Sequence, residues 1–179
     1  MLYLQISEHE GVHYIYFYQG RISNFHMETF SGRLSGDEYM QFCCGEQYIM
    51  ARKAIIMGDM DTFEKIMAET SPTKIKKLGR KVKNWNQELW DENVEQVAHD
   101  VCAYRMMDRN GDVTPYGLAL LEIVSPYEKY MFVEASITDA IWGVGGRPVS
   151  AHAYLMKNGE FKGRNILGRA VTDTVSLLQ

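Results

Sequence analysis

Proline and cysteine are scarce in this chain. Only 4 of its 179 residues are proline, while 46% are hydrophobic and 23% are charged, which is close to the composition of globular proteins. These values exclude collagen-like, low-complexity and disordered proteins. The 3 cysteines are an odd number, Cys43 and Cys44 are adjacent, and none belongs to a CxxC pair. The sequence therefore predicts neither a disulfide framework nor a zinc-binding cysteine cluster, and it indicates a reducing compartment.

Long apolar runs are absent as well. No stretch approaches the roughly 18 apolar residues that a membrane-spanning helix needs. The opening residues, MLYLQISEHE, have neither the basic region nor the apolar run of a secretory signal. We therefore expect a cytoplasmic protein that has no membrane partner.

Excess positive charge is also missing. The 19 basic and 23 acidic residues give a formal net charge of -4, which argues against a generic basic nucleic-acid binder. One local exception is the run from Lys74 to Lys83, which holds six basic residues and no acidic residue. Such a run is usually a solvated helix face, but it is also the place where a nucleic acid or a polyphosphate could dock.

The hydrophobic pattern predicts an α+β fold. Apolar residues at every second position favour a hairpin from Leu2 to Tyr18 that turns at Glu8–Gly11, and short strands follow between Phe30 and Phe42. Helical periods and cap signals predict helices that begin near Gly45, Asp61, Pro72, Asn86, Pro115 and Leu167, and an apolar strand over Tyr130–Ala135. We expect a single helix-rich domain over residues 1–179, with strands from the two ends of the chain packed together.

For two of these helices the sequence also predicts a detail: the N-cap residue of one and the buried face of the other. Asp61 and Glu64 have the spacing of a capping box, which places the N-cap at Asp61. In the helix that opens at Pro115, we expect Leu118, Leu121 and Ile123 to face the core.

Known nucleophile, phosphate-loop and metalloprotease motifs are absent. The sequence has no GxSxG, no GxxxxGK[ST] and no HExxH, and its 5 histidines are scattered. We therefore expect no metal and no cofactor, and any chemistry has to come from other side chains.

Three carboxylates stand out by their context. Glu46 lies in the expected first turn of an apolar helix, where the helix dipole alone favours an acid. Asp139 closes a Ser136-x-x-Asp139 spacing that a helix cap also explains. Glu134 ends an apolar strand, where an unpaired charge is costly. Each carboxylate is therefore either catalytic or structural on the pattern alone.

A glycine-rich segment, Trp142–Arg147, follows Asp139. Backbone N–H groups of Trp142–Arg147 could surround an anion, with the indole as a stacking surface, although such a run is more often a turn.

Several blocks, taken in order, resemble the NADAR family, whose name refers to NAD and ADP-ribose. The blocks are Phe17-Tyr18 with Ser23-Asn24-Phe25; Glu46-Gln47-Tyr48 with Ala51-Arg52-Lys53-Ala54 and Gly58-Asp59; Leu78-Gly79-Arg80; Trp90; Val133-Glu134-Ala135 with Asp139 and Trp142-Gly143; and Gly163-Arg164-Asn165 with Leu167-Gly168. They extend over nearly the whole chain. The sequence departs from the family pattern at Val144, where some members have Asp, and in insertions around Asp108–Thr114 and Ala151–Phe161.

The resemblance implies a compact α+β domain that hydrolyses N-glycosidic bonds between ribose and a base or base-like amine. It implies an ADP-ribosyl or phosphoribosyl small-molecule substrate, such as a riboflavin-pathway aminopyrimidine intermediate, or ADP-ribosylated guanine in nucleic acid as a modified substrate. The implied catalytic residues are Glu46 and Asp139. The implied substrate-binding residues are Ser23, Asn24, Lys53, Arg80, Trp90, Glu134, Trp142, Gly143 and Asn165.

A second function class uses the same aromatic and basic residues. A non-catalytic module that binds ADP-ribose or NAD would need the indoles and the cations, but it would gain nothing from carboxylates beside an anionic ligand. Glu46 and Asp139 therefore favour an enzyme. The leaving group and the oligomeric state do not follow from the sequence.

Overall fold

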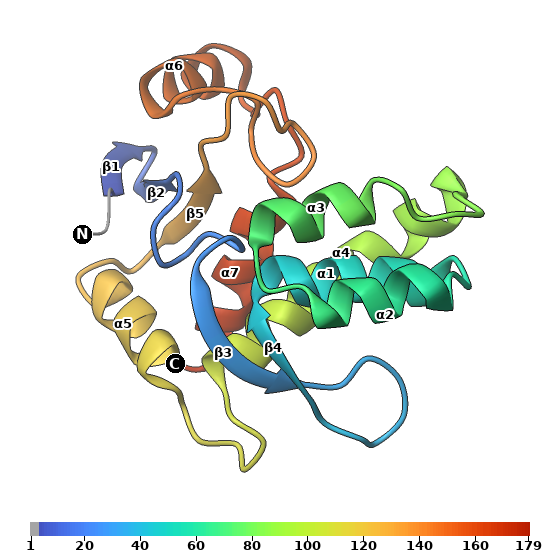
Figure 1. Ribbon diagram of the computed structural model, residues 1–179. Helices are drawn as coiled ribbons and strands as arrows, with labels where there is room; N and C mark the ends of the chain where they lie inside the picture. Colours follow the sequence, from blue (N-terminus) through green and yellow to red (C-terminus); the bar gives the residue numbers. More distant parts are fainter. Residues whose placement is uncertain (1–3) are drawn as a thin grey trace. The chain divides into compact units, whose positions relative to one another are not determined.

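A computed structural model describes residues 4–179, which contain seven helices and five strands (Figure 1). The predicted α+β fold class is confirmed by these elements. The residues form two compact units, which are described separately. The terminal unit is the chain up to Ser23 together with Pro115–Gln179, and the central unit is Asn24–Thr114. The single domain over residues 1–179 stays a prediction, and the start of the predicted first strand, before Leu4, lies outside the described residues.

A three-stranded mixed sheet organises the terminal unit. Strands β1 (Leu4–His9) and β2 (Val12–Phe17) form an antiparallel hairpin, and β5 (Tyr130–Glu134) pairs in parallel with β2. Positive φ angles of 52° at Glu10 and 77° at Gly11 give the tight turn that hairpins prefer. The predicted hairpin and the pairing of strands from the two ends of the chain are therefore confirmed.

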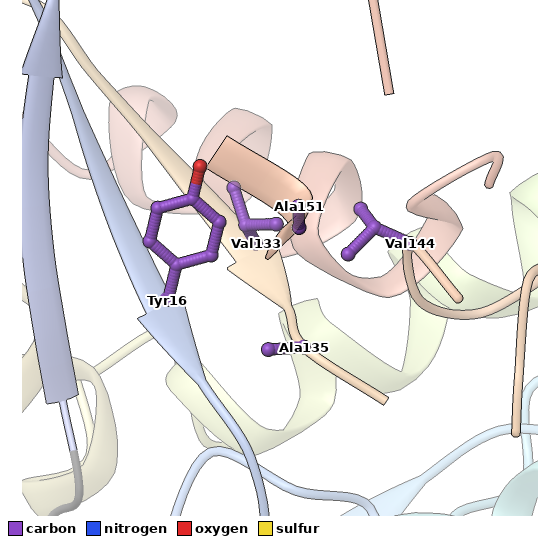
Figure 2. Packing of buried hydrophobic residues seen from close by; sticks show 5 residues of the cluster. All are labelled: Tyr16, Val133, Ala135, Val144 and Ala151. Carbon is purple, nitrogen blue, oxygen red and sulfur yellow. The ribbon is translucent and has the colours of Figure 1, made fainter. Parts of the chain in front are cut away.

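Helix α6 (Pro148–Asn158) covers part of this sheet, and most of it lies in the predicted insertion around Ala151–Phe161, for which no helix was predicted. Figure 2 shows the contact, in which Tyr16 and Val133 from β2 and β5 pack with Ala151 of α6. Ala135 and Val144, from the loop after β5, complete this buried cluster.

Helix α7 (Ile166–Leu177) lies along β5 and satisfies its open edge. The Phe132 N–H donates to Thr172 Oγ1 at 2.9 Å, and the Phe132 carbonyl accepts from Asn165 Nδ2 at 3.0 Å. An extra methyl group on Gly168 would lie 2.2 Å from the Phe132 carbonyl oxygen, so only glycine allows this approach. The edge of the sheet is thereby closed to further strands.

The exposed face of helix α5 (Pro115–Val124) differs from the prediction. Its buried residues are Tyr116, Gly117, Leu120 and Val124. Leu118 is 57% exposed, so its predicted position in the core is wrong, and Leu121 and Ile123 are only half-buried. Because the helix is apolar on nearly every side, its periodicity did not identify the buried face.

The central unit is a helical cluster with a two-stranded sheet. Strands β3 (Met27–Gly32) and β4 (Met40–Cys44) are antiparallel. The helices are α1 (Gly45–Ile56), α2 (Met60–Ala68), α3 (Pro72–Gly79) and α4 (Gln87–Met106). Helix α1 contacts the other three helices and β4, and its Tyr48, Ala51 and Ala54 are fully buried. The helix starts predicted at Pro72 and near Asn86 are confirmed.

The N-cap of α2 is Asp59, so the prediction of Asp61 is wrong. Asp59 Oδ1 accepts from the Thr62 N–H at 3.1 Å, and its Oδ2 accepts from the Lys83 N–H at 2.8 Å. This second bond joins α2 to the segment after α3, a long-range contact that local spacing does not reveal.

Candidate functional site

Helix α1 begins directly after strand β4, and Glu46 lies in its first turn. Cys44 is the N-cap residue with extended backbone angles, and its side chain makes no capping hydrogen bond. Glu46 is only 6% exposed. Burial makes a carboxylate costly unless it is compensated, and the positive end of the helix supplies part of that compensation.

Asn24 holds the start of this helix. Its backbone carbonyl accepts from the Glu46 N–H at 2.8 Å. A methyl group on Gly45 would lie 2.5 Å from Asn24 Oδ1, so glycine lets the amide pack directly against the first turn. Asn24 is 6% exposed, and Oδ1 is buried without a hydrogen-bond donor. A buried acceptor of this kind is suited to a ligand hydroxyl or a water molecule.

Gln47 fixes the same turn from the other side, although the sequence analysis gave it no role. Its Oε1 accepts from the Cys43 N–H at 2.8 Å. Its Nε2 donates to the carbonyls of Ile66 and Glu69 at 3.1 and 2.9 Å, at the end of α2. A glutamine three residues after the N-cap is the signal that could have found it.

Lys53 lies two helical turns after Glu46, and therefore on the same side of α1. Its Nζ lies 4.3 Å from the ring centroid of Trp85 and 5.8 Å from that of Trp90. The two indole rings are 6.1 Å apart. Lys53 is thus a half-buried cation held by two aromatic rings, an arrangement that desolvation strengthens.

Two other predicted site residues, Glu46 and Arg80, act on the charge of Lys53. Burial lowers the pKa of the Lys53 ammonium, the charge of Glu46 acts to raise it, and the charge of Arg80 lowers it further. The charges of Glu46 and Arg80 are therefore within electrostatic reach of Lys53. Cationic side chains such as Lys and Arg form strong, charge-assisted hydrogen bonds with an anion such as phosphate.

Helix α3 brings Arg80 to this position by packing closely on α1. Gly79 faces Met50 so tightly that a methyl group there would overlap the Met50 sulfur. Arg80 is the exposed C-cap residue of α3. One turn earlier, Lys76 Nζ lies 5.2 Å from the ring centroid of the exposed Phe25. The central unit thus has one cation–aromatic pair at Lys53, in the last turn of α1, and another at Lys76 of α3.

In the terminal unit, the predicted residues Asp139, Trp142 and Gly143 lie in the loop after β5. Asp139 Oδ1 accepts from the backbone N–H groups of Ile141 and Trp142, at 3.0 and 2.8 Å. A methyl group on Gly143 would lie 2.5 Å from the Glu134 carbonyl oxygen. This loop is therefore a fixed turn, and Asp139 is the residue that shapes it.

Asn165 joins the glycine-rich loop, β5 and α7. Its Oδ1 accepts from the Glu134 N–H at 3.0 Å, and its Nδ2 donates to the Phe132 carbonyl. Its own N–H donates to the Gly143 carbonyl at 3.1 Å. Both polar atoms of the amide are thus used by the protein backbone, which favours a positioning role.

The sequence matches the NADAR domain model over residues 8–179. The chain belongs to the NADAR domain family. It is similar to N-glycosidase R617 of Acanthamoeba polyphaga mimivirus, with 34% identity over 143 residues that cover 80% of this chain and 78% of the relative. Protein irg-1 of Caenorhabditis elegans is 31% identical over 153 residues, which cover 78% of this chain and 68% of that protein.

A solved structure supports the fold of this NADAR domain. The NMR structure of the Escherichia coli protein YbiA matches 96% of this chain and 87% of its own, with a TM-score of 0.66 and 23% identity. The resemblance expected from the sequence blocks and the α+β architecture are both confirmed.

The NADAR domain divides the predicted residues between its two units. Asn24, Glu46, Lys53, Arg80 and Trp90 lie in the central unit, and the terminal unit holds Ser23, Glu134, Asp139, Trp142, Gly143 and Asn165. Trp85 was missed, and its contact with Lys53 depends on the path of a loop. Across residues 4–179, no helix is long and apolar enough to span a membrane. Nor do three or more histidine, cysteine, aspartate or glutamate side chains within this range gather as metal ligands.

Proposed function

We propose that this NADAR domain protein is an N-glycoside hydrolase that cleaves the ribosyl C–N bond of an ADP-ribosyl or phosphoribosyl substrate. The name of the viral relative, N-glycosidase, supports the type of reaction. The observation that carries the proposal is the buried carboxylate of Glu46 beside the charges of Lys53 and Arg80. A carboxylate near two cations suits a phosphorylated riboside, because the cations attract its phosphate and the carboxylate stabilises the positive charge on its sugar carbon.

Breaking the C–N bond gives the sugar carbon oxocarbenium character. In the proposed reaction, the Glu46 carboxylate stabilises this positive charge and orients a water molecule. The electron pair of the broken bond stays on the base nitrogen, which takes up a proton. The water oxygen bonds to the sugar carbon, and Glu46 accepts the proton that the water loses. The products are the base or amine and the phosphorylated sugar, which is ADP-ribose or a ribose phosphate.

Binding roles are proposed for the other residues on the basis of their chemistry. Lys53 and Arg80 bind phosphate, Asn24 accepts from a sugar hydroxyl, and Trp90 contributes an apolar wall. Asp139 is proposed as a second carboxylate. The terminal-unit residues proposed for substrate binding or its support are Ser23, Glu134, Trp142, Gly143 and Asn165.

Two substrates fit the proposal: ADP-ribosylated guanine in nucleic acid, and a riboflavin-pathway aminopyrimidine intermediate. Each is incubated with the protein, and the products are measured by mass spectrometry: ADP-ribose and unmodified nucleic acid from the first substrate, free aminopyrimidine and sugar phosphate from the second. Hydrolysis of one of them is the expected result. Tight binding of ADP-ribose with no release from either substrate would instead favour a non-catalytic ADP-ribose or NAD-binding module.

A further inference from the structure

Trp85 is the most exposed of the three tryptophans of this chain. Its side chain is 44% exposed, whereas Trp90 is 7% exposed and Trp142 is half-buried. Isolated exposed apolar side chains are common on protein surfaces and need no explanation. Trp85 differs because the Lys53 ammonium lies over its indole ring and because this ring lies next to that of Trp90.

The backbone on both sides of Trp85 is fixed by hydrogen bonds. Before it, the Lys83 N–H donates to Asp59 Oδ2 at 2.8 Å, and Asn84 Nδ2 donates to the Met57 carbonyl at 3.4 Å. Asn84 also has a left-handed φ of 55°, which turns the chain sharply at this point. After Trp85, Asn86 Oδ1 caps α4 by accepting from the Leu89 N–H at 3.1 Å. An exposed indole on such an anchored loop is held in place before any ligand arrives.

The position of the indole relative to charge indicates what it would bind. Lys53 contacts the ring and is within electrostatic reach of Arg80 and Glu46. A phosphate bound by Lys53 would lie close to the Trp85 indole, and a base attached to it through a ribose would be within reach of the ring. An indole surface stacks favourably on a planar heteroaromatic ring.

We infer that Trp85 is the stacking surface for the planar base or base-like leaving group of a phosphorylated riboside. This inference rests on the proposed function, since it assigns the leaving group of that reaction to a specific side chain. It also assigns different tasks to the two neighbouring indoles. Trp90 supports the site from within the core, and Trp85 contacts the ligand.

The experiment compares a ligand that has a base with one that lacks it. Binding of GMP and of ribose 5-phosphate is measured by isothermal titration calorimetry for the full chain and for Trp85→Ala. Wild-type protein is expected to bind GMP more tightly than ribose 5-phosphate. Trp85→Ala is expected to weaken GMP binding by about 10- to 100-fold, the range for losing one stacked base, and to change ribose 5-phosphate binding by less than about twofold.

Two further variants control this measurement. Trp85→Phe keeps an aromatic surface and is expected to retain most of the GMP affinity. Tyr39 is an exposed aromatic residue of the same unit that carries Arg33 at 5.0 Å from its ring, so Tyr39→Ala removes a similar pair elsewhere and should leave both affinities unchanged.

Three results would overturn the inference. They are equal wild-type affinity for GMP and ribose 5-phosphate, unchanged GMP affinity in Trp85→Ala, and equal losses for both ligands in that variant. Hydrolysis of the two candidate substrates is assayed separately. A loss of stacking in a protein that hydrolyses neither would contradict the proposed function alone, and hydrolysis without a Trp85 effect would contradict this inference alone.

Discussion

The backbone N–H of Glu46 donates a 2.8 Å hydrogen bond to the carbonyl of Asn24. The first turn of α1 is thus tied to the segment before β3 through main-chain atoms. The position of the Glu46 backbone therefore does not depend on the charge of its side chain. A substitution that removes only this charge separates catalysis from folding.

We expect Glu46→Gln to lower turnover by at least about 100-fold, the usual scale for the loss of a positioned acid or base. The melting temperature should change little, because glutamine keeps the shape of the side chain. Initial rates of base release and thermal melts measure the two effects. Glu64→Gln, on the exposed face of α2, is the matched control and should retain full turnover. Near-normal turnover of Glu46→Gln would reduce Glu46 to a helix-dipole role.

Trp90→Phe should lower the stability of the protein more than its affinity for substrate. Trp90 is 7% exposed and packs within the central unit, so the smaller ring leaves unfilled volume in the core. Chemical denaturation and substrate binding are compared for the same variant. A variant that melts normally but binds substrate weakly would assign Trp90 to ligand contact.

Asn165→Ala should destabilise the protein by roughly 2 kcal/mol or more, because it leaves the Glu134 N–H and the Phe132 carbonyl without their partner. Urea denaturation measures the loss. Asn158→Ala removes an exposed asparagine amide that bonds only within α6, at Tyr154, and should cost far less. If the two variants were equally stable, the amide of Asn165 would be available for substrate.

Acid should weaken the contribution of Asp59 to stability. Hydrogen bonds from the Lys83 and Thr62 N–H groups hold the pKa of Asp59 below its ordinary 3.8. A carboxyl whose pKa is lower in the folded state stabilises the protein fully above the unfolded pKa, and the effect disappears as the pH falls through the folded pKa. At pH 7, Asp59→Asn should therefore unfold at a lower urea concentration than the wild type.

The difference between Asp59→Asn and the wild type should shrink as the pH is lowered below 3.8. Urea midpoints between pH 7 and pH 2 follow this change. If the difference between the two urea midpoints stayed constant from pH 7 to pH 2, the charge of the Asp59 carboxylate would not contribute to stability. Asp61→Asn, at an exposed position nearby, should show a much smaller gap at every pH.

Salt should weaken ligand binding only modestly. Three of the six basic side chains between Lys74 and Lys83 already have neighbours: Lys74 at Glu69, Lys83 at Asp61 and Lys76 over Phe25. We expect a log–log slope equivalent to about three phosphate contacts or fewer, at about −0.7 per contact for a single strand. Binding of a modified oligonucleotide and of ADP-ribose is measured from low to high salt. A steep slope for the oligonucleotide that Lys76→Ala with Lys77→Ala flattens would indicate a polymer substrate.

Local signals predicted much of the fold. Pro72 marks a helix start through its fixed backbone angle, Asn86 marks one through its capping side chain, and Gly11 favours a turn because glycine accepts positive φ. Asp59 was missed as a cap because Asp61 and Glu64, two residues further on, have the capping-box spacing, and its second partner, Lys83, is distant in sequence. The buried face of α5 was missed because its apolar residues surround the helix.

The part of the candidate site that lies on one helix could be predicted from the spacing of its residues. Glu46 and Lys53 share one side of α1 by spacing alone. The contact of Lys53 with Trp85 depends instead on the left-handed turn at Asn84 and on hydrogen bonds from this loop to the Asp59 carboxylate and the Met57 carbonyl. The sequence blocks identified Asn165, but only the structure shows that its amide bonds to β5.

Strand β2 has neighbours that the ribosome makes at very different times. The partner of residues 12–17 in β1 is synthesised just before them. Their partner on the other edge, residues 130–134, is synthesised only after the entire central unit. All contacts internal to the central unit join residues 24–114, so they can form while the hairpin still exposes a free edge. A free strand edge is a template for pairing with other chains. The period between the synthesis of β2 and that of β5 is therefore when a nascent chain of this protein is most exposed to aggregation, and a slower or paused ribosome would lengthen it.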